Sequence, residues 1–365
     1  MRLALVHDWL NQLGGAEDVL DHLLRLYPEA PLYTSIYDRE NMPAHWQNHE
    51  IHTLWMDKLP NIYRKHQRYL PLYPLAWGGL DLSDYDMILS NKSGFCHGVR
   101  YDKKTLHLCY CLAPTRYVWQ FDAYAARENF AQPIRWAVKS QIPWMRAWDK
   151  KAAQRVHHFI AISTDIQQRI KKYYGRDSVI IYPPVEVKER FQPASSTDGY
   201  FLSVGRLIPY KRVDLIVEAC TRLNLPLKVG GTGRDRERLE ALAGPTVEFL
   251  GYVPDADLPE LFARCKAFVF PGLEDFGITP VQAQAAGRPV IAYGAGGVLD
   301  TVIPGKTGVL FYEQQVEALI SVLQNFDDTA FNPDEIRQHA LQFDSTVFEQ
   351  RLTEYAARAW EQFNR

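Results

Sequence analysis

The sequence predicts an α/β protein of two domains, each built around a parallel sheet. The chain has 365 residues, which is enough for about two domains. Short apolar runs alternate with segments of helical periodicity, the pattern of βαβ units. This pattern is interrupted at Pro183-Pro184. Because two consecutive prolines cannot continue a central strand, we place the domain boundary directly after them.

In the first half, the apolar run at 3–6 predicts a buried strand, and Gly14-Gly15 follow it. A helix is expected next, because the apolar residues from Ala16 to Tyr27 recur at the spacing of one helix face. Pro28 ends this helix. Further strands are predicted at 86–90, 106–111, 158–163 and 179–182.

The second half repeats the alternation. Strands are predicted at 200–204, 227–229, 247–250, 267–270 and 289–293, and a last helix at about 345–363. In open parallel sheets, ligands bind beyond the carboxyl ends of the strands. The residues that directly follow each strand are therefore the candidates for a functional site.

Composition narrows the class of protein. The net charge is −2, which does not suit a nucleic-acid-binding protein. The five cysteines show no zinc-ligand spacing, as expected for a reduced, cytoplasmic protein. The apolar run at the N-terminus is too short to predict a signal peptide. No run of 18 apolar residues occurs, so any membrane contact is expected to be peripheral, at the inner face of the cell membrane.

Two glycine-rich turns precede helices. Gly14 and Gly15 would let the backbone approach a phosphate at a helix N-terminus, and the alternative is a plain turn. Gly231 lies in the turn Gly230-Gly231-Thr232-Gly233, which could admit a nucleotide or could be a flexible turn. A G-x-G-x-x-G dinucleotide pattern is absent from the first turn, which argues against NAD.

Charged residues follow two strands of the second half. Arg206 and Lys211 come after the strand at 200–204. A diphosphate leaving group needs positive charge, and charge-assisted hydrogen bonds contribute roughly 1.5–3 kcal/mol each. Glu274 lies in the loop after the strand at 267–270, and a loop carboxylate there is a site candidate. The alternative for all three residues is a solvated surface position.

Thr279 and Gln282 follow Glu274. With Pro280, they match a helix start in which Thr279 is the N-cap and Gln282 completes a capping box. No metal-ligand motif is present, neither H-E-x-x-H nor a D-x-D triplet at a strand end. We therefore expect no metal and no other cofactor.

Taken together, these segments resemble family 4 of the glycosyltransferases over almost the whole chain. Four segments carry the resemblance in order and at suitable spacing. They are His7-Asp8-Trp9-Leu10 with Gly14-Gly15-Ala16-Glu17, Ser203-Val204-Gly205-Arg206-Leu207 with Lys211, Phe249-Leu250-Gly251-Tyr252-Val253, and Glu274-Asp275-Phe276-Gly277-Ile278-Thr279-Pro280.

The resemblance implies the GT-B fold, in which two Rossmann-like domains face each other across a cleft and the C-terminal helix crosses back to the first domain. Residues 1–185, with about 345–365, would form the acceptor domain, and 186–344 the donor domain. The implied activity is metal-independent, retaining transfer of a hexose to a glycan or lipid-linked acceptor, with mannose from GDP-mannose as the expected donor.

The resemblance also implies residue roles. Arg206 and Lys211 would hold the diphosphate, and Glu274 would bind the hydroxyls of the donor sugar. The remaining implied contacts are backbone or polar contacts to the donor from Gly14, Gly15, Gly231, Val253, Phe276, Gly277, Ile278, Thr279 and Gln282.

Two positions depart from the family pattern. Gln282 stands where the family has a second glutamate, and Leu112 stands where it often has histidine. A glutamine still hydrogen-bonds a hydroxyl, so weaker or altered donor binding is expected. These departures keep open a non-catalytic nucleotide-sugar-binding protein, and an epimerase or phosphorylase on the same fold is a third alternative.

Two basic stretches contain aromatic residues. From 58 to 80 there are Lys58, Arg64, Lys65 and Arg68 and no acid, and from Ala131 to Val156 there are six basic residues and one acid, Asp149. The aromatic residues in these stretches are Tyr63, Tyr69, Tyr73, Trp77, Trp136, Trp144 and Trp148. Such a surface could contact an anionic membrane, and the alternative is a solvated helix face with core aromatics.

Overall fold

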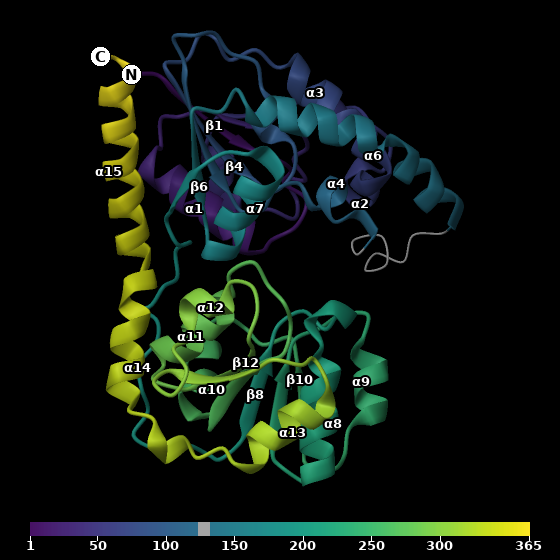
Figure 1. Ribbon diagram of the computed structural model, residues 1–365, viewed down its shortest axis with the longest axis vertical. Coiled ribbons are helices and arrows are strands. Elements are labelled where there is room, and N and C mark those ends of the chain that lie inside the picture. Colours follow the sequence, from purple (N-terminus) through teal and green to yellow (C-terminus); the bar gives the residue numbers. More distant parts are fainter. Residues whose placement is uncertain (123–131) are drawn as a thin grey trace. The chain divides into compact units, whose positions relative to one another are not determined.

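The computed structural model describes residues 1–122 and 132–365 (Figure 1). The chain divides into two compact units. Unit 1 comprises Met1–Pro184 and Phe348–Arg365, and unit 2 comprises Val185–Val347. The chain therefore leaves unit 1 once and returns to it with its last residues.

Among the described residues, unit 1 contains a parallel sheet of seven strands in the order β3-β2-β1-β4-β5-β6-β7. Every residue of β1, β4 and β5 is buried, as expected for strands covered on both faces. The strands are β1 (Leu3–His7), β2 (Leu32–Thr34), β3 (Ile51–Thr53), β4 (Met87–Lys92), β5 (Leu106–Cys111), β6 (His158–Ala161) and β7 (Ser178–Ile180).

Unit 2, which is described in full, contains a parallel sheet of six strands in the order β10-β9-β8-β11-β12-β13. The strands are β8 (Phe201–Val204), β9 (Leu227–Gly230), β10 (Val247–Gly251), β11 (Ala267–Phe270), β12 (Val290–Tyr293) and β13 (Gly308–Phe311). In both sheets the strand order has the 3-2-1-4-5-6 pattern of a doubly wound α/β fold.

Helices connect the strands, as parallel pairing requires. In α1, the residues Val19, Leu20, Leu23 and Leu24 are buried, so the predicted apolar face packs on the sheet. The α-helices of the described residues are α1 (Gly15–Leu26), α2 (Ile62–Lys65), α3 (Tyr73–Gly79), α4 (Arg116–Trp119), α6 (Gln132–Ala153), α7 (Thr164–Tyr174), α8 (Val213–Leu223), α9 (Arg236–Leu242), α10 (Leu258–Arg264), α11 (Ile278–Ala285), α12 (Val298–Thr301), α13 (Val316–Gln324), α14 (Pro333–Ala340) and α15 (Ser345–Phe363).

Short 3-10 helices occur in the connections. They are η1 (Ala44–Asn48), η2 (Trp55–Lys58), η3 (His66–Leu72), η4 (Cys96–Gly98), η5 (Pro209–Lys211), η6 (Asp328–Ala330) and η7 (Leu341–Phe343). No described helix combines the length and the apolar character that crossing a bilayer needs.

The C-terminal helix α15 packs against unit 1 through an apolar stripe. Phe348 and Leu352 are at most 2% exposed, and the ring of Phe348 meets that of Tyr110 of β5 edge-to-face at 5.6 Å. Glu349 contacts His22 of α1, with 2.8 Å between Oε1 and Nδ1. The predicted last helix is therefore confirmed, and it completes the core of unit 1.

Candidate active site

The two sheets share a feature that defines where ligands can enter. The strand order reverses between β1 and β4 in unit 1, and between β8 and β11 in unit 2. At such a switch point, the loops after the two central strands diverge and leave a crevice. Gly14 and Gly15 follow β1, Arg206 and Lys211 follow β8, and Glu274 follows β11.

At the switch point of unit 2, Lys211 and Glu274 form an ion pair. The distance from Lys211 Nζ to Glu274 Oε1 is 2.5 Å, and the side chains are 21% and 18% exposed. The ammonium also lies 5.7 Å from the centroids of the Phe270 and Tyr210 rings. The structure thus brings together two of the three residues expected to be catalytic.

The backbone around Lys211 explains this approach. Lys211 ends η5, and Arg212 then takes a left-handed conformation (φ 53°) that starts α8. A Cβ on Gly272, in the loop that carries Glu274, would lie 2.9 Å from the carbonyl oxygen of Lys211. The absence of a side chain at Gly272 therefore lets the two loops touch.

Two further glycines, Gly296 and Gly297, lie against the Glu274 loop. The N–H of Gly297 donates to the Glu274 carbonyl at 2.9 Å. A Cβ on Gly297 would lie 2.2 Å from Phe276 Cα, and one on Gly296 would lie 2.4 Å from the Glu274 carbonyl oxygen. The loop after β12 is therefore fitted against Glu274, a role that the glycine pattern alone did not reveal.

Arg206 belongs to the same edge of unit 2 but has an exposed side chain. Its loop is held by two backbone hydrogen bonds, from Gly205 N to O of Gly230 at the end of β9 (3.0 Å) and from Leu207 N to O of Thr232 in the next loop (2.9 Å). No hydrogen bond or ion pair joins Arg206 to Lys211 or Glu274 in the described part of the chain. Its expected contact with a diphosphate stays a prediction.

The glycine-rich turn after β9 is tightly packed rather than flexible. A Cβ on Gly231 would lie 1.9 Å from the Gly205 carbonyl oxygen, and the N–H of Gly231 donates to Gly251 O at 2.6 Å. Val253 is close, since its Cγ2 lies 2.9 Å from an ideal Cβ on Gly230. The turn and the segment expected to contact the base are therefore neighbours.

The start of α11 differs from the predicted capping box. The helix begins at Ile278, its N-cap is Gly277 (φ 95°), and no side chain caps it. The capping-box prediction for Thr279 and Gln282 is wrong, because the left-handed glycine starts the helix before Thr279 is reached. Gln282 is instead a half-buried residue within the helix.

This helix start places backbone donors next to Glu274. The first N–H groups of an α-helix have no partner within the helix, and those of Ile278 and Thr279 belong to this turn. Phe276, which precedes the N-cap, has its side chain buried at 4% exposure against the ring of Phe343. It can therefore offer a ligand its backbone but not its ring.

In unit 1, Gly14 and Gly15 are exposed at the start of α1. The first turn of this helix already contains the acidic residues Glu17 and Asp18. The Glu17 carboxylate is buried, and its Oε1 lies 3.4 Å from Nε2 of His7. A diphosphate bound by the two glycines would therefore lie close to Glu17 and Asp18. This expected contact stays a prediction.

The switch point of unit 1 is filled by a side chain of the protein itself. The buried Asp8 carboxylate accepts four backbone hydrogen bonds from the loop after β4. Its Oδ2 accepts from Ser93 N (2.7 Å) and Gly94 N (2.5 Å), and its Oδ1 from Phe95 N (2.6 Å) and Cys96 N (2.8 Å). Successive amides of this kind bind anions, and here the anion that they bind is the Asp8 carboxylate.

Sequence reasoning missed the buried polar residues nearby, namely Lys92, Thr115 and Asp149. All three are 0% exposed. Burial raises the pKa of Asp149, against the lowering effect of Lys92 and of hydrogen bonds. Lys92 ends a strand that begins with the apolar run Met87–Leu89, and Asp149 is the one acid in a basic helix. These two exceptions to their local patterns were the available signal.

Leu112 directly follows β5 and is 9% exposed. Its N–H donates to the carbonyl of Lys92 at 2.8 Å. The side chain is therefore packed, and it has no polar group with which to bind a substrate.

The described residues contain no group of three or more His, Cys, Asp and Glu side chains that could hold a metal ion. The five cysteines are free and buried.

The basic stretches divide into core and surface. Tyr73 and Trp77 are fully buried, so the core alternative holds for them, and Trp148 packs partly buried against the same core. Trp136 and Trp144 of α6 are 79% and 42% exposed. Ala131, at the start of the second stretch, lies outside the described residues.

Comparison with known proteins identifies the family of the chain. The family model "Glycosyl transferases group 1" matches residues 185–329, which is most of unit 2. A GDP-mannose-dependent alpha-mannosyltransferase of Mycolicibacterium smegmatis is 33% identical over 331 residues, covering 85% of this chain and 84% of that protein. A D-inositol 3-phosphate glycosyltransferase of Streptomyces scabiei is 25% identical over 295 residues, or 70% and 63% of the two chains.

Two solved structures share the whole fold. Anabaena Alr3699/HepE, in complex with UDP, superposes with a TM-score of 0.72 at 18% identity, covering 98% of this chain and all of that one. Sucrose-phosphate synthase of Thermosynechococcus elongatus superposes with a TM-score of 0.75, also at 18% identity, over 99% and 100%. Because the identity to the mycolicibacterial enzyme extends through both units, the chain belongs to family 4 of the glycosyltransferases and is a hexosyltransferase with the GT-B fold.

Proposed function

We propose that this glycosyltransferase moves mannose from GDP-mannose, with retention of configuration, to a glycan or lipid-linked acceptor. The observation that carries the proposal is the Lys211–Glu274 pair at the switch point of unit 2. The name of the mycolicibacterial relative supports the donor, and membership of family 4 supports retention.

The pair offers a donor sugar phosphate two complementary partners. As the bond between sugar and diphosphate breaks, negative charge develops on the leaving group, and preorganised positive charge stabilises it. Lys211 has three N–H donors, so it can hold a phosphate oxygen while it still contacts Glu274. Glu274 accepts hydrogen bonds from sugar hydroxyls, and Arg206 adds a second positive charge on the diphosphate.

The protein supplies positioning and charge rather than a nucleophile. The donor phosphate itself takes the proton of the acceptor hydroxyl on the face from which the leaving group departs. The first N–H groups of α11 complete the anion cradle beside Glu274. Gln282 stands in the same helix and, as a neutral amide, hydrogen-bonds a ribose hydroxyl less strongly than a carboxylate would.

The two switch points support different ligands for the two units. In unit 1 the successive backbone amides of residues 93–96, after β4, are already taken by Asp8. In unit 2 the corresponding edge has Lys211, Arg206 and the start of α11. We therefore assign the nucleotide sugar to unit 2 and the acceptor to the strand ends of unit 1.

Replacing Lys211 by alanine tests this function. We expect Lys211→Ala to lower the turnover of GDP-mannose by about 10²-fold, as single-donor losses at developing negative charge do. Lys306→Ala is the matched control, because Lys306 is an exposed lysine of the same unit outside the site. Turnover should also be unchanged by EDTA. Full activity of Lys211→Ala with any nucleotide sugar would contradict the mechanism.

A second candidate function is a non-catalytic nucleotide-sugar-binding protein, which Leu112 and Gln282 favour. The two candidates differ in a simple assay. An enzyme slowly releases GDP from GDP-mannose without an acceptor, whereas a binding protein is stabilised by GDP-mannose in a thermal-shift assay and releases none.

We also propose a peripheral contact of unit 1 with an anionic membrane, which suits a lipid-linked acceptor. Arg64, Lys65 and Arg68 are exposed, and η3, which contains Arg68, packs against α6, the helix of the exposed Trp136 and Trp144. Figure 1 shows α2, α4 and α6 gathered at one end of unit 1. Cationic and interfacial aromatic side chains together suit such a surface.

A further inference from the structure

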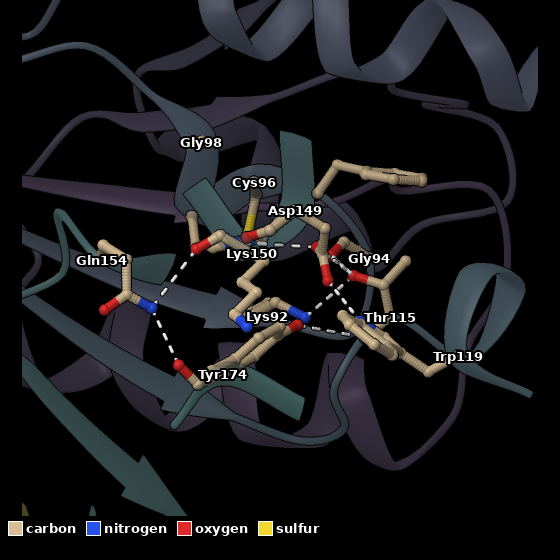
Figure 2. A network of polar contacts seen from close by, with 12 residues as sticks. Lys92, Gly94, Cys96, Gly98, Thr115, Trp119, Asp149, Lys150, Gln154 and Tyr174 are labelled. Carbon is tan, nitrogen blue, oxygen red and sulfur yellow. Dashed lines mark hydrogen bonds and ion pairs between the residues drawn. The ribbon is translucent and has the colours of Figure 1, made fainter. Parts of the chain in front are cut away.

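A buried polar network lies beside the switch point of unit 1 (Figure 2). Lys92, the last residue of β4, is fully buried. Its Nζ donates to the carbonyl oxygen of Ala113 at 3.0 Å and to the hydroxyl of Thr115 at 3.1 Å. The strand end of β4 is thereby tied to the loop that follows β5.

The Thr115 hydroxyl connects three elements. Its Oγ1 lies 2.6 Å from the carbonyl oxygen of Gly94 and 2.7 Å from Oδ1 of Asp149 in α6. A hydroxyl has one hydrogen and two lone pairs, so with Lys92 donating to it, one proton is shared among the remaining contacts. Trp119 Nε1 donates to the other oxygen of Asp149 at 2.6 Å, so the network also fixes the end of α4.

The loop after β4 is also held by Asp8. Its carboxylate holds the four amides of residues 93–96, and a Cβ on Gly94 would lie 2.7 Å from the Trp9 ring. The loops after β1, β4 and β5 therefore form one connected structure, which we call the strand-end platform (residues 8–9, 92–97 and 112–116). It stands at the edge of the sheet where α/β proteins bind ligands.

Stability alone does not explain this construction. Burying charged groups is costly, and well-packed apolar residues of similar volume often stabilise a core equally well or better. The unit nevertheless buries Lys92 and Asp149 completely and bridges them through one hydroxyl. Fully satisfied buried networks fix a single conformation, and here the fixed parts are the loops at the ligand edge.

We propose that Lys92, Thr115 and Asp149 are positioning residues for the acceptor: through the Thr115 hydroxyl they hold the strand-end platform in the one arrangement that orients an acceptor hydroxyl for transfer. This inference rests on the proposed function, because it assigns the acceptor to unit 1. The hydrogen bonds of the network join residues of unit 1 to one another, whereas the proposed donor residues belong to unit 2, so the network should affect transfer without affecting use of the donor.

The test is the pair Thr115→Val and Thr115→Ser. Valine keeps the shape of threonine and removes the hydroxyl, whereas serine keeps the hydroxyl. Transfer of mannose to methyl α-mannoside and hydrolysis of GDP-mannose without acceptor are measured for each variant. We expect Thr115→Val to lower the ratio of transfer to hydrolysis by about tenfold or more, as small misplacements of a reactant do, and Thr115→Ser to keep it.

Equal ratios in the two variants would overturn the proposal, and so would a Thr115→Val variant that loses hydrolysis in proportion to transfer. If Thr115→Val does not fold, Trp119→Phe takes its place in the same assay. This change removes the hydrogen bond from the Trp119 ring to Asp149 and leaves the Thr115 hydroxyl in place.

Amide hydrogen exchange separates this proposal from the proposed function. In Thr115→Val, amides of 93–97 and 112–119 should exchange at least about tenfold faster while those of β4 and β5 stay protected. Unchanged exchange in both loops would overturn the platform. If the wild type neither binds nor uses GDP-mannose while Thr115→Val still shows this faster exchange, the proposed function is refuted and the platform stands.

Discussion

At the residue scale, the position of a charged side chain relative to its strand end decides what it can do. Lys92 is the last residue within β4, so the sheet and its covering helices enclose it. Lys211 comes seven residues after β8 ends, so it reaches the edge and remains 21% exposed. The first lysine can only hold its own protein together, whereas the second can meet a substrate.

Histidine 66 should make unit 1 sensitive to acid. Burial lowers the pKa of His66 to about 4 from its ordinary 6.5, and its ring stacks on Trp9 with centroids 5.3 Å apart. Because the folded pKa is the lower one, the unfolded chain binds the proton first as the pH falls. Stability is thus unaffected above about pH 6.5 and falls by about 3 kcal/mol as the pH approaches 4.

Denaturant unfolding at pH 7 and pH 4.5 measures this effect. His66→Gln should lose less stability than the wild type over this interval, while His52→Gln, at an exposed position, should behave like the wild type. A His66→Gln protein with the full acid sensitivity of the wild type would show that the loss arises elsewhere.

Single residues also mark the limit of prediction from sequence. Glu274 and Lys211 could be predicted to meet, because each follows a strand next to the switch point. Asp149 could not, because a carboxylate in a helix with five basic residues is typical of a solvated face. Its burial depends on Thr115 and Trp119, which come from a distant part of the chain.

At the scale of elements, glycines determine how the loops of unit 2 fit together. Gly231 and Gly272 remove side chains where two loop backbones touch, and Gly297 does the same beneath Glu274. These contacts hold Arg206, Lys211 and Glu274 at one edge of the sheet.

Adding a methyl group at such a contact should destabilise unit 2. Gly231 and Gly305 both have positive φ (128° and 77°), but a Cβ on Gly231 would meet Gly205 O at 1.9 Å, and one on Gly305 would meet nothing within 4 Å. We expect Gly305→Ala to lower the free energy of unfolding by about 1–2 kcal/mol, and Gly231→Ala by roughly 1–3 kcal/mol more. Equal losses of unfolding free energy in the two variants, measured by thermal or urea unfolding, would show that the loops move apart at little cost.

The sequence predicts a strand where the strand itself contains a clear run of apolar residues. The predicted strands are confirmed, with ends shifted by a few residues. β2 (Leu32–Thr34), β3 (Ile51–Thr53) and β13 (Gly308–Phe311) were missed. The first two have three residues each, which is too few to show a period. They are strands because β2 pairs with β1 and β3 pairs with β2. The start of α11 was misplaced because a left-handed glycine overrode the side-chain pattern.

At the scale of the whole molecule, the exposed cations of unit 1 should matter for membrane binding. Each basic residue close to an anionic surface contributes about 1 kcal/mol. The double variant Lys65→Ala/Arg68→Ala should therefore bind phosphatidylserine-containing vesicles about thirtyfold more weakly in co-sedimentation. Tyr252→Ala, which removes an exposed aromatic residue of unit 2, is the control. Equal binding to vesicles of neutral lipid would exclude an electrostatic contact.

The route of the chain also sets an order of synthesis. Unit 2 is an insertion in unit 1, because the polypeptide departs at Pro184 and comes back at Phe348. During translation the ribosome makes the residues of unit 2 before it makes Phe348–Arg365, which finish the core of unit 1. Unit 2 can thus begin to fold on the nascent chain, while the earlier-made part of unit 1 waits, with Tyr110 and its neighbours uncovered, until Phe348 and the residues after it have been made.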